Sequence, residues 1–223
     1  MAESTRRTAG QKLAELARMD QEIWETGTVF AGIDEAGRGP LCGPVAAACV
    51  VMPPQPLLLG VDDSKKLSEA RREILYERIM QTALFAGVGL AGAEEIDRLN
   101  ILQATKLAMA RAAQGAPCAL FLVDGNQPVV LPGEVRCAVG GDARCYSIAA
   151  ASIVAKVTRD RLLRRMDAEY PGYGFARHKG YGTAAHLAAL RALGPTPQHR
   201  RSFLGHILGE ETHAKTDQSP RRG

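Results

Sequence analysis

The stretch GIDEAGRGPLCGPVAAA, residues 32–48, holds the end of one apolar segment, a glycine-rich loop and the start of a second apolar segment. Residues 28–33 are apolar and lead directly into Asp34 and Glu35, a pattern that predicts a strand ending in a loop. Residues 45–52 are a second candidate for a buried strand. Two acids directly after an apolar strand are costly to bury without a partner or a metal. The stretch therefore predicts two strands joined by a loop with a chemical role.

The rest of the sequence alternates between strand and helix patterns. Further strand candidates cover residues 83–92, 119–123 and 134–139, the last as an edge strand. Helical patterns cover residues 10–25, 68–81, 147–166 and 183–193. Because strands come first and then alternate with helices, we predict an α/β domain with a mixed sheet and helices on both faces.

Composition and charge set broad limits. The chain has 223 residues, which suits one domain with a sizeable core, and 46% of them are hydrophobic, as in soluble globular proteins. Lys and Arg outnumber Asp and Glu by 28 to 24, so the chain permits a polyanionic partner without demanding one. No apolar run reaches the roughly 20 residues of a membrane span, and no secretory signal is evident. We therefore predict a cytoplasmic protein.

Cysteine and histidine spacing gives no metal signal. The five cysteines are an odd number and lack paired C-x-x-C spacing, so neither a disulfide framework nor a zinc site is predicted. Most lie in apolar segments, and we interpret them as core residues. None of the five histidines has metal-ligand spacing with another.

Four acidic residues stand at the ends of predicted strands: Asp34, Glu35, Asp124 and Asp142. Open α/β sheets bind ligands at such ends. Clustered carboxylates can hold two divalent cations for phosphodiester chemistry. Taken singly, Asp124 is better explained as part of a hairpin turn with Gly125, and Asp142 also follows a turn signal. Since successive strand residues point to opposite faces, we expect the strand to break at Glu35 so that both acids of the pair reach one site.

Glycine and aromatic residues suggest a surface for nucleic acid. Gly37, Arg38 and Gly39 match neither the Walker A nor the dinucleotide-binding pattern. Their bare backbone and guanidinium suit a nucleic-acid backbone instead. Tyr181 lies in an aromatic-rich loop, and its ring suits stacking on a base or sugar.

Basic residues fall into two groups. Lys65, Lys66 and Lys179 lie in predicted loops, where contact with phosphate is the more credible role. The basic residues within 161–165 lie on a predicted helix and are better explained as a solvated face.

Five blocks stand in a characteristic order: GIDEAGRGPLCGPVAAA at 32–48, DDSKKLS at 62–68, LVDGN at 122–126, GDARCYSIAAASIVAKVTRDR at 141–161 and YPGYGFARHKGYGT at 170–183. Together they resemble the type 2 ribonuclease H family, specifically bacterial ribonuclease HII, over most of residues 29–204. Cys42 and Tyr146 differ from the residues common at their positions, and neither falls on a functional one. The resemblance implies a ribonuclease H-like fold, with a mixed five-stranded sheet flanked by helices and extra C-terminal helices.

The resemblance also implies an activity. Such an enzyme hydrolyses the RNA strand of RNA–DNA hybrids and incises 5′ of single ribonucleotides embedded in duplex DNA. Water attack assisted by two Mg²⁺ or Mn²⁺ ions leaves 3′-hydroxyl and 5′-phosphate ends. The implied partners are the hybrid and the ribonucleotide-containing duplex, with no membrane and a monomeric enzyme.

Site residues carry over position by position. The matching metal-binding and catalytic acids are Asp34, Glu35, Asp124 and Asp142. The matching substrate-binding residues are Gly37, Arg38 and Gly39, which sense the ribose 2′-hydroxyl, Tyr181, which stacks on the neighbouring sugar, and Lys65 and Lys66, which lie in a phosphate-contacting loop.

We divide the chain into a partly helical extension at 1–27, a catalytic domain at 28–208 that resembles ribonuclease H, and a tail at 209–223 whose polar composition predicts disorder. Three alternatives remain at this stage. A non-catalytic hybrid-binding protein would lose one or more of the acids. A ribonuclease HIII-like enzyme carries a further N-terminal domain and a Glu where Asp142 stands. A DNA-cutting nuclease of the same fold would need neither the Gly-Arg-Gly loop nor Tyr181.

Overall fold

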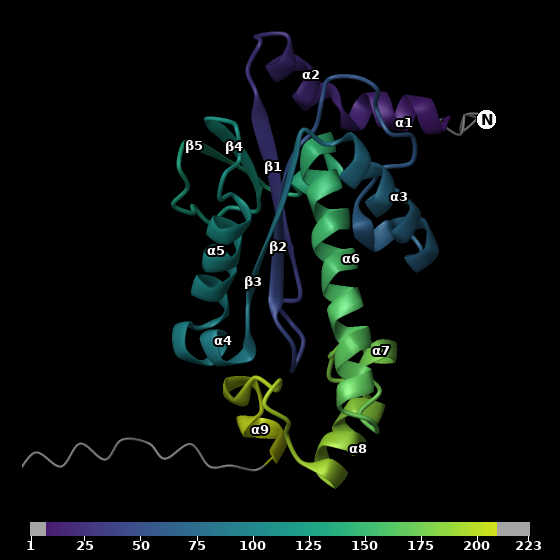
Figure 1. The fold of residues 1–223 in the computed structure, drawn as a ribbon, viewed down its shortest axis with the longest axis vertical. Coiled ribbons are helices and arrows are strands. Elements are labelled where there is room, and N and C mark those ends of the chain that lie inside the picture. The colour runs from purple at the N-terminus through teal and green to yellow at the C-terminus, as the bar shows by residue number, and fades with distance from the viewer. Residues whose placement is uncertain (1–7, 209–223) are drawn as a thin grey trace, which may run out of the picture.

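The computed structural model describes residues 8–208 and forms one mixed sheet in this part of the chain (Figure 1). Its strands are β1 (Phe30–Ala36), β2 (Val45–Val51), β3 (Phe85–Ala91), β4 (Leu120–Asp124) and β5 (Glu134–Ala138). The order across the sheet is β3-β2-β1-β4-β5. β2 is antiparallel to β1 and β3, whereas β1, β4 and β5 run parallel. The predicted mixed five-stranded sheet is confirmed.

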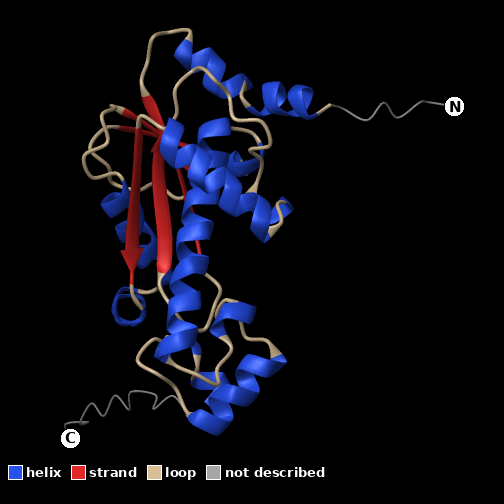
Figure 2. Ribbon diagram, turned by 45° about the vertical axis from the view of Figure 1, so that its right-hand side comes forward, coloured by secondary structure: helices blue, strands red, loops and turns tan. Residues whose placement is uncertain are grey.

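One face of the sheet is covered by the long helix α6 (Tyr146–Glu169), which runs along β1 and β2 (Figure 1). Ala48 and Val50 of β2 pack into the apolar first half of this helix. A Cβ at Gly32 would lie 2.2 Å from the carbonyl carbon of Ser147, so only glycine permits this close approach. Helix α3 (Glu69–Thr82) packs outside α6 (Figure 2) and begins at Ser68, whose side chain accepts a hydrogen bond from the Arg71 amide as an N-cap.

Helix α5 (Ile101–Ala112) covers the opposite face, with α4 (Ala93–Leu99) before it. Its buried side chains pack against Ile33 and Ala47 in a second apolar cluster. A Cβ at Gly89 would lie 2.0 Å from the Ala108 carbonyl oxygen, so β3 also approaches its helix through glycine. Helices therefore lie on both faces, as predicted.

The N-terminal helices α1 (Ala9–Leu16) and α2 (Arg18–Trp24) replace the single peripheral helix expected over 10–25. They join the core, because Leu13 and Leu16 pack into the apolar cluster beneath α6. Asp20 is fully buried, and its carboxylate accepts hydrogen bonds from the amides of Tyr146 and Ser147, each at 2.8 Å. An anion at a helix N-terminus is favourable, so α2 caps α6. The proposed boundary between residues 27 and 28 stays a prediction.

The C-terminal elements gather at the far end of α6 (Figure 1). They are α7 (Phe175–His178), α8 (Ala184–Leu193), the 3₁₀ turn Arg201–Phe203 and α9 (Gly205–Leu208). The extra C-terminal helices are confirmed, and the loop expected over 170–181 contains the short α7. The predicted tail at 209–223 lies outside the described residues. Among residues 8–208, no helix has the length and apolar character to cross a bilayer.

The cysteines only partly follow the expected burial. All five are free thiols. Cys42, Cys49 and Cys145 are buried, but Cys118 is half-buried and Cys137 is exposed. The core interpretation was wrong for Cys137, because β5 is an edge strand.

Candidate active site

Three carboxylates meet at one edge of the sheet. Asp34 lies on β1, Asp124 ends β4, and Asp142 lies in the 3₁₀ turn Gly141–Ala143 just before α6. Each offers a carboxylate oxygen within 4.8 Å of those of the other two. The parallel neighbours β1 and β4 end at the same edge, which brings the first two together. We call Asp34, Asp124 and Asp142 the acid cluster. The hairpin explanation for Asp124 was wrong, because β4 and β5 are parallel.

Glu35 stands apart from the acid cluster, and the expected strand break is absent. β1 continues to Ala36, with Asp34 paired to Ala48 and Glu35 paired to Ala47. Ala48 belongs to the α6 side of the sheet and Ala47 to the α5 side, so the two acids point to opposite faces. The predicted strand break is wrong, although the alternation of side chains on which it was based does hold. Glu35 instead lines a cavity of about 50 Å³ on the α5 side, which Asp124 also lines.

Burial and mutual repulsion disfavour the charged forms of Asp34, Glu35 and Asp124. Burial raises the pKa of Asp34 well above its ordinary value, and the charges of Glu35 and Asp124 add to the effect. Burial also raises the pKa of Asp124 and of Glu35, although Arg38 opposes the rise at Glu35. A cation bound among the carboxylates would remove this repulsion. The donors are all hard oxygens, which Mg²⁺ and Mn²⁺ prefer, so the residues present fit a divalent-metal site.

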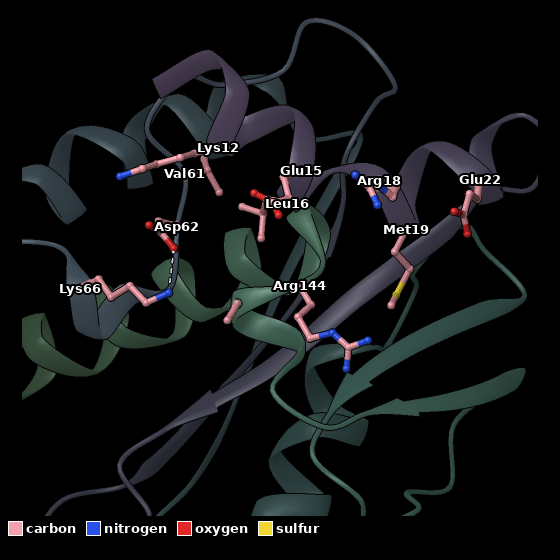
Figure 3. Close-up of a pocket in the computed structure, with 11 residues that line it drawn as sticks. Lys12, Glu15, Leu16, Arg18, Met19, Glu22, Val61, Asp62, Lys66 and Arg144 are labelled. Atoms are coloured by element: carbon pink, nitrogen blue, oxygen red, sulfur yellow. Dashed lines mark hydrogen bonds and ion pairs between the residues drawn. The ribbon is translucent and has the colours of Figure 1, made fainter. Parts of the chain in front are cut away.

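One ammonium already partly neutralises the cluster. Lys65 Nζ lies 2.9 Å from Asp142 Oδ2, and this hydrogen bond is the largest cause of the raised Lys65 pKa. Lys66 instead lies 3.3 Å from Asp62 Oδ1 (Figure 3). The 3₁₀ turn Ser64–Lys66 that carries both is tied to α6 by the hydroxyls of Ser64 and Ser152, 2.7 Å apart. Of the two predicted phosphate contacts, only Lys65 therefore reaches the acid cluster.

The Gly-Arg-Gly loop directly follows β1, which ends at Ala36. Arg38 Nη1 lies 3.3 Å from Glu35 Oε1, which leaves the Arg38 side chain half-exposed. A Cβ at Gly39 would lie 3.8 Å from the Tyr181 ring, so this ring stands beside the loop with 47% of its surface exposed. Gly37 has φ +94° and no room for a Cβ, which would lie 1.9 Å from Arg159 Nε. The structure thus brings Tyr181 and the loop together.

A buried arginine holds the loop from behind. Arg200 is fully buried and donates to the carbonyls of Gly37 at 2.6 Å, Arg38 at 2.8 Å, Pro40 at 2.8 Å and Gly43 at 2.9 Å. In a planar trans peptide the N–H points opposite to the C=O. Since the Gly37 and Arg38 carbonyls face Arg200, the amides that follow them, of Arg38 and Gly39, face away from it. Within residues 8–208 neither amide has a hydrogen-bond acceptor, so both are free for a ligand.

Arg159 plays a similar part on the other side of the loop. It is fully buried on α6 and donates to the carbonyls of Pro44 at 3.0 Å, Lys179 at 2.9 Å and Cys42 at 3.1 Å. Its position four residues after Ala155, on the buried face of the helix, was a usable signal that it is not solvated. Arg200 offered no such signal, because its partners are about 160 residues away in sequence.

Three further basic residues of the predicted groups, Arg161, Arg164 and Lys179, are engaged in ion pairs. Arg161 donates to Glu73 and Glu77, and Arg164 also pairs with Glu73, which ties α6 to α3. Lys179 Nζ lies 3.3 Å from Glu69, so this lysine is occupied in a salt bridge. These contacts explain Arg161 and Arg164 of the charge run on α6 without a substrate.

Two buried histidines form a hydrogen-bonded relay behind Tyr181. The Thr196 amide donates to His199 Nδ1 at 2.9 Å, so His199 carries its proton on Nε2. That proton is donated to His186 Nε2, 3.1 Å away, and His186 Nδ1 then donates to the Tyr181 carbonyl at 3.0 Å. We call Arg159, Arg200, His186 and His199 the loop scaffold.

Cys42 also lies against these histidines, with ligand atoms of the three residues within 4.8 Å of one another. Sequence spacing gave no hint of this proximity. The relay uses the Nε2 atoms of both rings for their mutual hydrogen bond, and a metal at His199 Nε2 would require an imidazolate. The cluster is therefore better explained as packing than as a metal site.

Structural comparison relates the fold to ribonucleases of the H type. The ribonuclease HII of Archaeoglobus fulgidus, solved in a complex with PCNA, matches with a TM-score of 0.67 and 27% identity over 78% of this chain and 94% of its own. Ribonuclease H2 of Pyrococcus horikoshii matches with a TM-score of 0.65 and 27% identity over 78% and 93%. A ribonuclease HIII solved with Mn²⁺ shares only the fold, at 16% identity and a TM-score of 0.54. The fold and its relatives define an endonuclease of the ribonuclease H class.

Sequence comparison narrows the class. The ribonuclease HII family model matches residues 31–205. Ribonuclease HII of Geobacter sulfurreducens is 58% identical over 79% of this chain and 82% of its own. That of Paramagnetospirillum magneticum is 56% identical over 81% and 92%. The chain belongs to the ribonuclease HII family, whose members act on RNA–DNA hybrids. The predicted family is confirmed, and this excludes the alternatives of a ribonuclease HIII-like enzyme and of a non-catalytic hybrid-binding protein.

Proposed function

We propose that the enzyme incises duplex DNA on the 5′ side of single embedded ribonucleotides and also hydrolyses the RNA strand of hybrids. The products carry 3′-hydroxyl and 5′-phosphate ends. The observation that carries this proposal is the convergence of Asp34, Asp124 and Asp142 within 4.8 Å at the sheet edge where the Gly-Arg-Gly loop begins. The residues that would hydrolyse a phosphodiester and the loop that would recognise a ribose then lie side by side.

The metal ligands are Asp34, Glu35, Asp124 and Asp142. When bound, two Mg²⁺ or Mn²⁺ ions supply activation of water and stabilisation of the departing 3′-oxygen. The acid cluster approaches the site from the α6 side, and Glu35 contributes from the α5 side, where Asp124 is its neighbour. Asp124 therefore links the two groups of ligands. It is held for this role by the Gly141 amide, which donates to its Oδ1 at 2.7 Å.

Substrate contacts come from the loop and from Tyr181. The free amides of Arg38 and Gly39 donate to the ribose 2′-hydroxyl or to the phosphate beside it, which distinguishes ribose from deoxyribose. Tyr181 stacks on the neighbouring sugar. Lys65 contacts phosphate once a cation takes over its present partner Asp142, because its side chain is 77% exposed and can swing outward. Lys66 contributes to the same backbone contact.

The test uses a labelled duplex with one ribonucleotide, beside an all-DNA duplex and a long hybrid, with Mg²⁺ and Mn²⁺ compared. We expect a single cut 5′ of the ribonucleotide and none in the all-DNA control. The end chemistry follows from whether a ligase and a polymerase accept the products. Cleavage of the hybrid but not of the single-ribonucleotide duplex would refute the finer activity. Light scattering with bound duplex tests the accompanying expectation that the enzyme acts as a monomer.

A further inference from the structure

A groove of about 680 Å³ opens next to the acid cluster, and of its lining residues only Lys66 has a role in the function proposed above (Figure 3). Its walls are helices α1 and α2, the segment 61–66 and the turn that carries Asp142. Two walls are shared with the site, because Lys66 follows Lys65 and Arg144 lies two residues after Asp142. The groove therefore adjoins the acid cluster.

The cations of this groove are unlike those on α6. Lys12, Arg18 and Arg144 are exposed, and none of their side chains makes a hydrogen bond or ion pair with another residue in the range 8–208. Arg161 and Arg164 on α6, by contrast, are paired with glutamates. Unpaired cations in a concave surface attract an anion at little cost, because no internal partner has to be displaced.

The groove is also rigidly placed. Asp20 accepts two amide hydrogen bonds from the start of α6, and Leu13 and Leu16 anchor α1 in the core. The helices that present Lys12 and Arg18 are thus fixed relative to Asp142. They precede residue 31, where the family match begins, so this wall is outside the matched region of the chain.

We propose that this groove binds the phosphodiester backbone of the duplex a few nucleotides from the cleavage site, with Lys12, Arg18 and Arg144 as the phosphate contacts. The inference rests on the proposed function, since a duplex cut at the acid cluster must continue along the surface beside it. Phosphate contacts of this kind position the duplex without reading its sequence.

The acids of the groove sharpen the proposal. Three acids line the groove: Asp62 is paired with Lys66, Glu15 also has an interaction partner, and Glu22 has no ion pair to another described residue (Figure 3). Its carboxylate opposes a passing phosphate. Removing this charge therefore strengthens duplex binding, whereas removing the cations weakens it.

The experiment compares a triple variant (Lys12→Gln, Arg18→Gln, Arg144→Gln) with a matched triple that removes three exposed charges elsewhere (Arg78→Gln, Arg98→Gln, Arg191→Gln). KM and kcat are measured on the single-ribonucleotide duplex at several salt concentrations. We expect the groove triple to raise KM at least about tenfold at 0.1 M salt with kcat unchanged. The slope of log affinity against log salt should become shallower by about 0.9 for each phosphate that the variant no longer neutralises. Glu22→Gln should lower KM.

Shortening the duplex on one side at a time locates the bound phosphates. On the side that reaches the groove, shortening should abolish the difference between wild type and groove triple. The proposal is overturned if the groove triple and the matched triple have the same KM and salt slope. Failure of the proposed function looks different, because wild type itself would then not cut the single-ribonucleotide duplex.

Discussion

The acid cluster and the loop scaffold lie on two sides of one site and are built in opposite ways. In the acid cluster, three carboxylates crowd together, two of them buried, and Lys65 pairs with one of them, Asp142, so the like charges are only partly compensated. In the loop scaffold, buried groups are almost fully bonded: Arg200 reaches four carbonyls, and the histidine relay uses all four ring nitrogens.

The difference follows from what each side has to bind. A metal ligand must keep lone pairs free, so the acid cluster is left short of partners and depends on an external cation. A surface that distinguishes a hydroxyl from a hydrogen must hold its donors still, so the loop scaffold is supplied with internal partners. Variants on the two sides should therefore differ in kind: those of the acid cluster lose chemistry, and those of the loop scaffold lose stability and selectivity.

The largest effect is expected for Asp34→Asn or Asp124→Asn. Removing a charged metal ligand should lower the cleavage rate at least about a thousandfold, or about 4 kcal/mol of barrier, with duplex affinity largely kept. Rates on the single-ribonucleotide duplex in Mg²⁺ measure this. Glu94→Gln, an exposed acid on α4, is the control. A near wild-type rate for either variant would remove that residue from the site.

The next largest effect is expected at Arg200. Arg200→Met leaves the loop carbonyls without donors and should lower the free energy of unfolding by about 2–5 kcal/mol. Arg200→Lys keeps the positive charge but loses the planar guanidinium that donates to several carbonyls. The folded fraction of this variant should therefore show a lower kcat/KM on the single-ribonucleotide duplex. Its affinity for all-DNA duplex should be unchanged. Arg201→Lys, at an exposed neighbour, is the matched control. Equal loss in both lysine variants would contradict a positioning role for Arg200.

A pH effect follows from the histidine relay. Burial, with the nearby His186, lowers the pKa of His199 from 6.5 to about 4. Between these values the unfolded chain binds a proton that the folded chain does not, so folding stability falls as pH drops from about 6.5 to 4, by at most about 1.4 kcal/mol per pH unit. Above pH 6.5 the contribution is complete. Chemical unfolding of wild type and His199→Gln across this range measures it: the variant should show the shallower decline, and parallel curves would refute the relay.

Sequence reasoning found what local patterns encode. Local patterns placed Asp34, Asp124 and Asp142 at or after the ends of predicted strands. Taken singly, Asp124 and Asp142 were better explained as turn residues, and only the resemblance joined the three acids into one site. The strand break that sequence reasoning predicted at Glu35 was wrong, because β1 is unbroken there and alternation places this acid on the other face. Sequence reasoning also missed Arg200, His186 and His199, whose partners are fixed only by the packing of the C-terminal elements against the loop. Burial of a polar side chain depends on those distant segments and leaves little trace in its own neighbourhood.

The smallest effect is a gain in stability on the acid side. Burial and like charges raise the pKa of Asp34 well above its unfolded value, so the ionised carboxylate destabilises the metal-free fold at neutral pH and not below the unfolded value of about 3.8. In chelator at pH 7.5, Asp34→Asn should therefore raise the free energy of unfolding by about 1 kcal/mol or more, or about 2–4 °C in Tm. Added Mg²⁺ should stabilise wild type more than the variant, because binding to the folded state alone is stabilising. A variant that is less stable than wild type in chelator would show that the surroundings of Asp34 stabilise its carboxylate by more than burial and like charges cost. The contrast between a strained acid cluster and a fully bonded scaffold would then not hold at this residue.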